Sequence, residues 1–156
     1  MGEISQIGII VRDLVAGMDH YGALMGLGPW RVHVSSAPPI RCTYEGREVS
    51  YSARIAMARA GSILVELIQP LEGESTYHDF LAEHGEGLHH FAVDVSDMDQ
   101  ACRPFTEQGI GVLQSGEGGG ESKDGRYVYL DTRATLGAIL EFRQPPTVRG
   151  SVSTYP

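Results

Sequence analysis

Residues 6–13, QIGIIVRD, decide the fold of this chain, because residues 90–97, HFAVDVSD, repeat their plan. Each stretch opens with a polar side chain, continues through a short apolar strand and ends at an aspartate, Asp13 or Asp97. Apolar residues at helical spacing follow both aspartates, and an aspartate at the start of a helix accepts hydrogen bonds from the free backbone N–H groups of the first turn. The sequence therefore predicts two copies of one strand-and-helix unit.

The end of each unit is repeated as well. Residues 65–70, VELIQP, match residues 140–145, LEFRQP, and each run holds one central glutamate, Glu66 or Glu141, before a final proline. Proline cannot donate a hydrogen bond to a sheet ladder, so it ends such a strand. Because strand and turn signals fill the interval between these markers, the order strand, helix and three strands is expected twice.

The repeat predicts an α+β fold in which two βαβββ modules build a curled, largely antiparallel sheet cup. Module one covers about residues 3–72 and module two about residues 86–145, joined by a linker helix at about residues 75–84. Residues 36–48 are expected to form a long loop, and the C-terminal tail at residues 146–156 to be irregular. The whole chain, residues 1–156, has the length of a single domain.

Composition excludes several classes of protein. Hydrophobic residues make up 42% of the chain and charged residues 21%, which is typical of a globular protein rather than a disordered one. The formal net charge of −8 argues against a nucleic-acid partner, because phosphate binding needs a basic face. No apolar run approaches the ~20 residues that a membrane span needs, so no membrane partner is expected. Two cysteines without a CxxC pair, and a first segment without the apolar core of a signal peptide, predict a reduced, cytoplasmic protein.

Strand alternation places the repeated polar residues on the sheet face opposite the helices. Successive side chains of a strand point to opposite faces, so Gln6 and His90 lie opposite the large apolar residues that pack under the helices. Glu66 and Glu141 each stand between two apolar neighbours and project away from them. A carboxylate in a central strand is costly to bury unless it is paired or binds a metal.

These four residues, Gln6, Glu66, His90 and Glu141, therefore predict one divalent metal site inside the cup. Any one of them alone would be an ordinary solvated or hydrogen-bonded residue, but all four occupy equivalent repeat positions. One imidazole, two carboxylates and one amide oxygen suit Zn, Co, Ni, Mn or Mg. The set is poor for an oxygen-activating iron centre, which commonly uses two histidines and one carboxylate.

At these residues the chain resembles the vicinal oxygen chelate superfamily, which includes glyoxalase I, methylmalonyl-CoA epimerase, extradiol dioxygenases and bleomycin-type resistance proteins. The resemblance covers about residues 3–145 and is nearest to methylmalonyl-CoA epimerase through residues 66–71, ELIQPL, and residues 84–92, HGEGLHHFA. It implies a cup of repeated βαβββ modules that holds a metal, with His90 rather than His89 as the ligand.

One ligand departs from the epimerase pattern. Epimerases usually carry a histidine where this chain has Gln6, and the order Gln, Glu, His and Glu is similar to animal-type glyoxalase I instead. The chemistry that the resemblance implies is enolisation next to a carbonyl, with the metal as Lewis acid and a carboxylate as base. Glu141 is the first candidate for that base, and Glu48, which lies in the expected loop, is the second.

Three functions follow from this interpretation. The first is a metal-dependent epimerase or isomerase that acts on a small molecule with adjacent oxygens, such as a CoA thioester. The second is a lactoylglutathione lyase of the glyoxalase I type. The third is a non-catalytic protein that binds a drug or metabolite, as resistance proteins do.

Two expectations concern the surface. The run from Trp30 to Val34 resembles an outer strand with apolar residues, and an exposed strand edge invites pairing, so a homodimer is predicted. The histidines without repeat partners are expected at the surface: His20, His33, His78 and His84.

Overall fold

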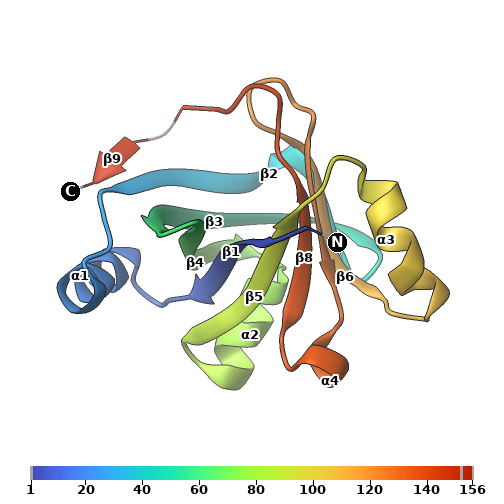
Figure 1. Cartoon of the computed structure of the whole chain (residues 1–156), viewed down its shortest axis with the longest axis horizontal. Helices are drawn as coiled ribbons and strands as arrows, with labels where there is room; N and C mark the ends of the chain where they lie inside the picture. Colours follow the sequence, from blue (N-terminus) through green and yellow to red (C-terminus); the bar gives the residue numbers. More distant parts are fainter. Residues whose placement is uncertain (1, 152, 156) are drawn as a thin grey trace.

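The computed structural model describes residues 2–151 and 153–155, in which the strands form one mixed sheet with the helices at its periphery (Figure 1). The strands are β1 (Ile4–Ile10), β2 (Trp30–Tyr44), β3 (Arg47–Ala60), β4 (Ile63–Gly73), β5 (Gly87–Asp94), β6 (Val112–Gly119), β7 (Gly125–Leu130), β8 (Ile139–Gln144) and β9 (Ser153–Tyr155). The helices are α1 (Leu14–Met25), α2 (Thr76–His84), α3 (Met98–Glu107) and α4 (Arg133–Leu136).

The sheet curls into a ring. Its strand order is β3-β4-β1-β5-β8-β7-β6-β2, and β2 pairs again with β3, which closes the circle, while β9 adds to the outside of β2. Each half of the chain runs strand, helix and three strands, with α2 between the halves and the short α4 inserted before β8. The β1–β4 and β5–β8 pairs are parallel, and the remaining pairs are antiparallel. The expected α+β class and largely antiparallel sheet are therefore present.

The four strands β4-β1-β5-β8 carry the repeated polar residues side by side. Gly8 of β1 is in register with Glu66 on one side and with His90 on the other. Its repeat equivalent Ala92 stands in the same way between β1 and β8. Small residues at these two places leave room above the strands for the larger polar side chains beside them.

The predicted aspartate caps are confirmed. Asp13 accepts hydrogen bonds from the backbone N–H groups of Val15 and Ala16 at the start of α1. Asp97 accepts one from Gln100 at the start of α3. The caps fix the direction in which each helix leaves its strand.

The two longer repeat helices cover the outer face of the sheet. Leu14 and Met18 of α1 pack with Leu67 of β4, and Met98 of α3 packs with Phe142 of β8. These side chains point away from the faces that carry the repeated polar residues. The apolar alternation of the strands thus separates the core under the helices from the inside of the ring.

The expected loop at residues 36–48 is wrong. β2 continues to Tyr44, and a short turn at Glu45 and Gly46, both with positive φ (49° and 75°), leads directly into β3. The final residues of β2, from Arg41 to Tyr44, pair with β6 of module two. Pairing between the modules thus extends the strand where the local composition indicated a loop.

The expectation of an irregular tail at residues 146–156 is also wrong in part. β9 pairs with residues Trp30–Val32 of β2, and Trp30 is only 1% exposed. The strand edge on which the homodimer was argued is therefore covered by the chain's own tail, and the dimer stays a prediction without that support. The expected linker helix is present as α2. No helix in the described part of the chain is long and apolar enough to cross a membrane.

Candidate functional site

The four repeated polar residues come together inside the ring. His90 Nε2 lies 3.2 Å from Glu141 Oε2 and 3.5 Å from Glu66 Oε2. Gln6 Nε2 donates a hydrogen bond of 2.8 Å to Glu66 Oε2. All four side chains are buried, with residue exposures between 0% and 8%.

Two of these groups have buried atoms without a hydrogen-bond partner. His90 Nε2 and Glu141 Oε2 are both enclosed, and neither makes a hydrogen bond within the described residues. Native proteins leave few buried polar atoms unpaired, so an atom of this kind indicates a missing ion, water or ligand. The two atoms face each other, and Glu66 Oε2 is a second carboxylate oxygen beside them.

The donor set fits a divalent metal ion, although the side chains do not stand as a closed shell. In residues 2–151 and 153–155, no group of three or more His, Cys, Asp and Glu side chains has metal-ligating geometry. Gln6 turns its nitrogen to Glu66, and its oxygen accepts a hydrogen bond from Arg143. Only the oxygen of an amide is a metal ligand, so Gln6 would have to rotate to join the set.

Charge in this cluster is shared between His90 and its carboxylates. Burial lowers the pKa of His90, but Glu141 and Glu66 together raise it further, to about 9. Burial also raises the pKa of Glu141 above its usual range, and His90 opposes that rise. In the protein without metal, His90 is therefore positively charged near neutral pH and forms ion pairs with Glu141 and Glu66.

His89 contacts the His90 ring directly, because the pairing of β1 with β5 is irregular here. Gly8 pairs with His90 and Ile9 with Leu88, so His89 is an extra residue of β5. Its Nδ1 lies 2.9 Å from His90 Nδ1, and its Nε2 lies 3.2 Å from the Thr76 hydroxyl. Burial lowers the pKa of His89 well below its usual value, so this ring is neutral. It packs against Tyr77 and Phe80 of α2 and against Tyr129, and both tyrosines line the cavity inside the ring, so His89 does not point away from the inside of the ring as strand alternation predicts. A hydrogen bond at Nδ1 leaves Nε2 of His90 as the atom that faces the carboxylates, an arrangement common for metal-binding histidines.

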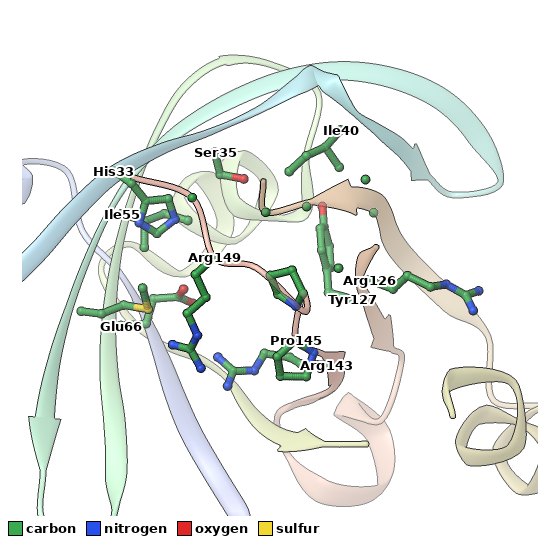
Figure 2. A pocket seen from close by; sticks show the side chains of 18 of the residues that line it. His33, Ser35, Ile40, Ile55, Glu66, Arg126, Tyr127, Arg143, Pro145 and Arg149 are labelled. Atoms are coloured by element: carbon green, nitrogen blue, oxygen red, sulfur yellow. The ribbon is translucent and has the colours of Figure 1, made fainter. Parts of the chain in front are cut away.

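A cavity of about 560 Å³ opens beside this cluster. Its volume lies in the range of sites for small molecules and cofactors. Strands of both modules and the tail after β8 supply its walls, as Figure 2 shows for several of the side chains. The lining joins apolar residues such as Ile55 and Met57 to phenols such as Tyr127 and Tyr129.

His33 belongs to this cavity, so its expected place at the surface is wrong. It lines the wall from β2, and its Nδ1 is buried without a hydrogen-bond partner in the described residues (Figure 2). Burial lowers the pKa of His33, and the nearby Glu66 opposes this effect. Alternation along β2 could have found it, because Arg31, His33 and Ser35 share one strand face and all three line the cavity.

Glu48, the second candidate base, is not at the site. It lies near the turn between β2 and β3 and is exposed. Tyr51, Ala53 and Ile55 of β3 are buried toward the inside of the ring, so the even-numbered position 48 points to the other face. The structure therefore does not bring Glu48 to Glu141.

Besides His33, the cavity holds arginines that comparison of the two repeats did not predict. Four of them line the cavity: Arg31, Arg126, Arg143 and Arg149. Arg143 stands two residues after Glu141 on the same face of β8, where the matching place in module one holds the apolar Ile68. Comparison between the repeats therefore passes over it, whereas alternation within β8 could have found it.

The fold and this site define a family. Residues 5–129 match the Glyoxalase/Bleomycin resistance protein/Dioxygenase superfamily. The chain belongs to this superfamily, which confirms the resemblance noted in its sequence.

One curated protein and several solved structures are similar to this chain. The uncharacterized protein YqjC of Bacillus subtilis is 26% identical over 145 residues, which are 93% of this chain and 94% of that protein. A Streptomyces coelicolor methylmalonyl-CoA epimerase in complex with 2-nitronate-propionyl-CoA is similar with a TM-score of 0.69 at 24% identity, over 94% of this chain and 99% of that one. The methylmalonyl-CoA epimerase of Mycobacterium tuberculosis has a TM-score of 0.66 at 23% identity, over 92% and 87%. These structures share the fold of this chain.

Proposed function

We propose that this protein is a metal-dependent epimerase or isomerase that moves a proton next to a carbonyl group of a CoA thioester. The observation that carries the proposal is the buried ion pair of His90 and Glu141 beside a cavity of substrate size, in which Nε2 and Oε2 face each other at 3.2 Å and neither has a hydrogen-bond partner in the described residues. The shared fold supports the substrate class, because the similar epimerases were solved with acyl-CoA ligands, methylmalonyl-CoA among them.

Four residues would hold the metal: Gln6 through its amide oxygen, Glu66 and Glu141 through carboxylates, and His90 through Nε2. The chemistry that a bound divalent ion, such as Zn, Co, Ni, Mn or Mg, supplies there is Lewis-acid stabilisation of negative charge on the substrate's carbonyl oxygen. His90 must release its proton to bind, so metal affinity should fall as pH falls. His89 keeps the ring oriented during this change.

Glu141 is the candidate base for removal of the proton from the α-carbon. Its burial raises its pKa, and a carboxylate with a raised pKa is a stronger base than an exposed one. It also lies at the cavity wall, where a substrate carbon can approach it.

His33 is the candidate for the second proton-transfer group, the role for which Glu48 lies too far out. In the ring order β3-β4-β1-β5-β8-β7-β6-β2, β2 lies four strands from β5 in either direction, so His33 faces the site from the opposite wall. A neutral imidazole with a free nitrogen both accepts and donates a proton near neutral pH. Two such groups on opposite faces of one carbon are what epimerisation requires.

The test is solvent deuterium exchange at the α-carbon of the two methylmalonyl-CoA epimers, followed separately with metal-loaded protein. We expect Glu141→Gln to abolish exchange from one epimer and His33→Gln to abolish exchange from the other. Glu72→Gln, which changes an exposed carboxylate on β4, is the matched control and should exchange as the unchanged protein does. Absence of exchange from both epimers in the unchanged, metal-loaded protein would refute the proposal.

The ligand set favours one further candidate, a lyase of the glyoxalase I type. Its substrate is the hemithioacetal of a thiol and an α-ketoaldehyde, which also enolises next to a carbonyl. Conversion of that adduct without exchange on acyl-CoA esters would establish the lyase. Binding of small molecules without either reaction would instead establish a non-catalytic protein.

A further inference from the structure

The charge of the cavity lining differs from that of the chain. The whole chain has 12 basic and 20 acidic residues. The lining holds four arginines against three glutamates, and two of these glutamates belong to the proposed metal site. The cavity therefore offers positive charge to a ligand although the protein as a whole is acidic.

Arg143 has a fixed position deep in this lining. Its Nε and Nη2 donate to Asp94 Oδ1 at 2.9 Å and 2.7 Å, and its Nη1 donates to the amide oxygen of Gln6. A guanidinium has five N–H donors, so two remain after these three bonds. Only 18% of the side chain is exposed, and hydrogen bonds made at such a site are less weakened by water than surface ones.

Arg149 enters the same cavity from the strap, the segment at residues 145–151 that follows β8. The strap is tied down on both sides of Arg149. Val148 accepts a hydrogen bond of 2.9 Å from the Glu121 backbone, and β9 beyond it pairs with β2. Figure 2 shows Arg149 reaching from the strap into the cavity that Arg143 also lines.

Arg149 lacks the carboxylate partner that Arg143 has. Within the described residues, Arg149 takes part in no ion pair, whereas Arg143 is paired with Asp94. Two guanidinium groups that line one cavity repel each other unless an anion lies between them. Planar guanidinium groups suit a carboxylate, which accepts two parallel hydrogen bonds.

We propose that Arg143 and Arg149 bind a carboxylate on the reacting carbon of the substrate and so select acyl groups with an acidic substituent. Arg143 stands two strand residues from Glu141 on the same face, a separation of about 7 Å, so the bound carboxylate lies within reach of the carbon that Glu141 deprotonates. The position of this carboxylate beside the carbon that loses its proton rests on the proposed function. We call this pair of arginines the clamp. Its binding of a carboxylate is measured without turnover.

The experiment compares two ligands that differ in one group. Methylmalonyl-CoA and isobutyryl-CoA share the CoA part and the branched carbon, and the second has a methyl group where the first has the carboxylate. Binding is measured by calorimetry with protein treated with a chelator, so that no metal contributes to the preference. We expect the unchanged protein to prefer methylmalonyl-CoA by at least about tenfold, as charged hydrogen bonds imply.

Arg143→Met and Arg149→Met should each reduce this preference and leave the affinity for isobutyryl-CoA unchanged. Arg41→Met is the matched control, because Arg41 is exposed, pairs with Glu117 and is outside the cavity lining. Arg149 lies on the exposed strap, so its variant tests the clamp even where Arg143→Met fails to fold.

Three results would overturn the clamp. They are equal affinity for the two ligands in the unchanged protein, a preference that survives in the Arg149 variant, and an equal loss of both affinities. The last would assign the arginines to the phosphates of CoA. A preference that depends on both arginines, in a protein that exchanges no α-proton, would support the clamp and reject the epimerase.

Discussion

The polar pairs of the two modules differ in chemistry. In module one, Gln6 and Glu66 satisfy each other through a hydrogen bond of 2.8 Å. In module two, His90 Nε2 and Glu141 Oε2 lie 3.2 Å apart, and both atoms lack a hydrogen-bond partner in the described residues. The same strand positions therefore give a hydrogen-bonded amide–carboxylate pair in one module and an imidazole–carboxylate ion pair in the other. In the proposed function, module two supplies one proton-transfer group, Glu141, and module one supplies the other, His33, from the opposite wall of the cavity.

The modules also differ in the length of their middle strands. β2 and β3 have 15 and 14 residues, whereas β6 and β7 have 8 and 6. β2 pairs with β6 through its last residues, Arg41 to Tyr44, and so closes the ring, while His33 near its start lies on the cavity wall. Module one thus places an ionisable side chain, His33, on the wall opposite Glu141, whereas its own polar pair is Gln6 and Glu66.

The largest effect is expected from a matched pair of substitutions at the two glutamates. Glu141→Gln should keep near-stoichiometric metal and lose at least about 10²-fold in turnover, because glutamine retains a ligand oxygen but cannot act as a base. Glu66→Gln should lose less turnover, since Glu66 already accepts a hydrogen bond from Gln6 and is not the proposed base. Metal content by elemental analysis, beside exchange rates, separates the two effects.

His90→Ala is the reference for this pair, because it removes the only imidazole ligand and should lower metal content and turnover together. Full exchange activity in Glu141→Gln would make Glu141 at most a ligand. The distinction between the modules would then be lost, and His33 would be the remaining base.

A second pair of substitutions tests the small residues between the strands. In Gly8→Ala the new Cβ would lie 1.9 Å from Cε1 of His90, so the ring must move and metal binding should fail. We expect a loss of about 1–3 kcal/mol in the free energy of unfolding, as for other overpacked cores. Ala92→Gly removes only a methyl group and should cost about 0.5–1 kcal/mol. Urea unfolding measures both, and equal costs would contradict the close approach of His90 to β1.

The part of the site that could be predicted is the part encoded twice. Gln6, Glu66, His90 and Glu141 were found because each has a partner at the same place in the other module. His33 has no such partner, so comparison of the two modules passes over it, and only alternation along β2 could have found it.

The error at Glu48 has a different origin. Apolar residues at Tyr51, Ala53 and Ile55 already place position 48 on the outer face, so strand alternation could have excluded it. The expected loop obscured this pattern, because alternation has no meaning outside a strand. Arg149 was beyond sequence reasoning altogether, since its position depends on the pairing of the tail with β2.

The pH dependence of stability should also differ between the modules. In metal-free protein, burial lowers the pKa of His90, but Glu141 and Glu66 raise it to about 9, above the unfolded value of 6.5. A group with a raised pKa stabilises the fold fully below its unfolded pKa, and this stabilisation is lost as pH rises through the folded value. The melting temperature should therefore fall between pH 6.5 and 9. His90→Gln should remove this slope, whereas Gln6→Ala should retain it, and a slope that persists in His90→Gln would assign it to another group.

The smallest effect is expected at the strap, whose two ends belong to different modules. At the module-two end, hydrogen bonds from Ser122 and Thr147 lower the pKa of Asp124 to about 2, from an ordinary value of 3.8. A lowered pKa stabilises the contact above the unfolded value, so this anchor should weaken as pH falls from about 4 to 2. At the module-one end, β9 is held by backbone pairing with β2, which does not titrate, and by a long hydrogen bond of 3.4 Å from the Tyr155 hydroxyl to Asp19.

Hydrogen-exchange protection of the Thr147 amide, which donates to Asp124 at 2.9 Å, should therefore decrease in this pH range and in Asp124→Asn. Protection of the β9 amides that donate to β2 is the internal control and should remain, because backbone pairing does not titrate. Parallel loss at both positions would mean that the strap opens as one cooperative unit. Arg149 would then leave the cavity whenever either anchor fails, and the two ends could not be assigned separately to the two modules.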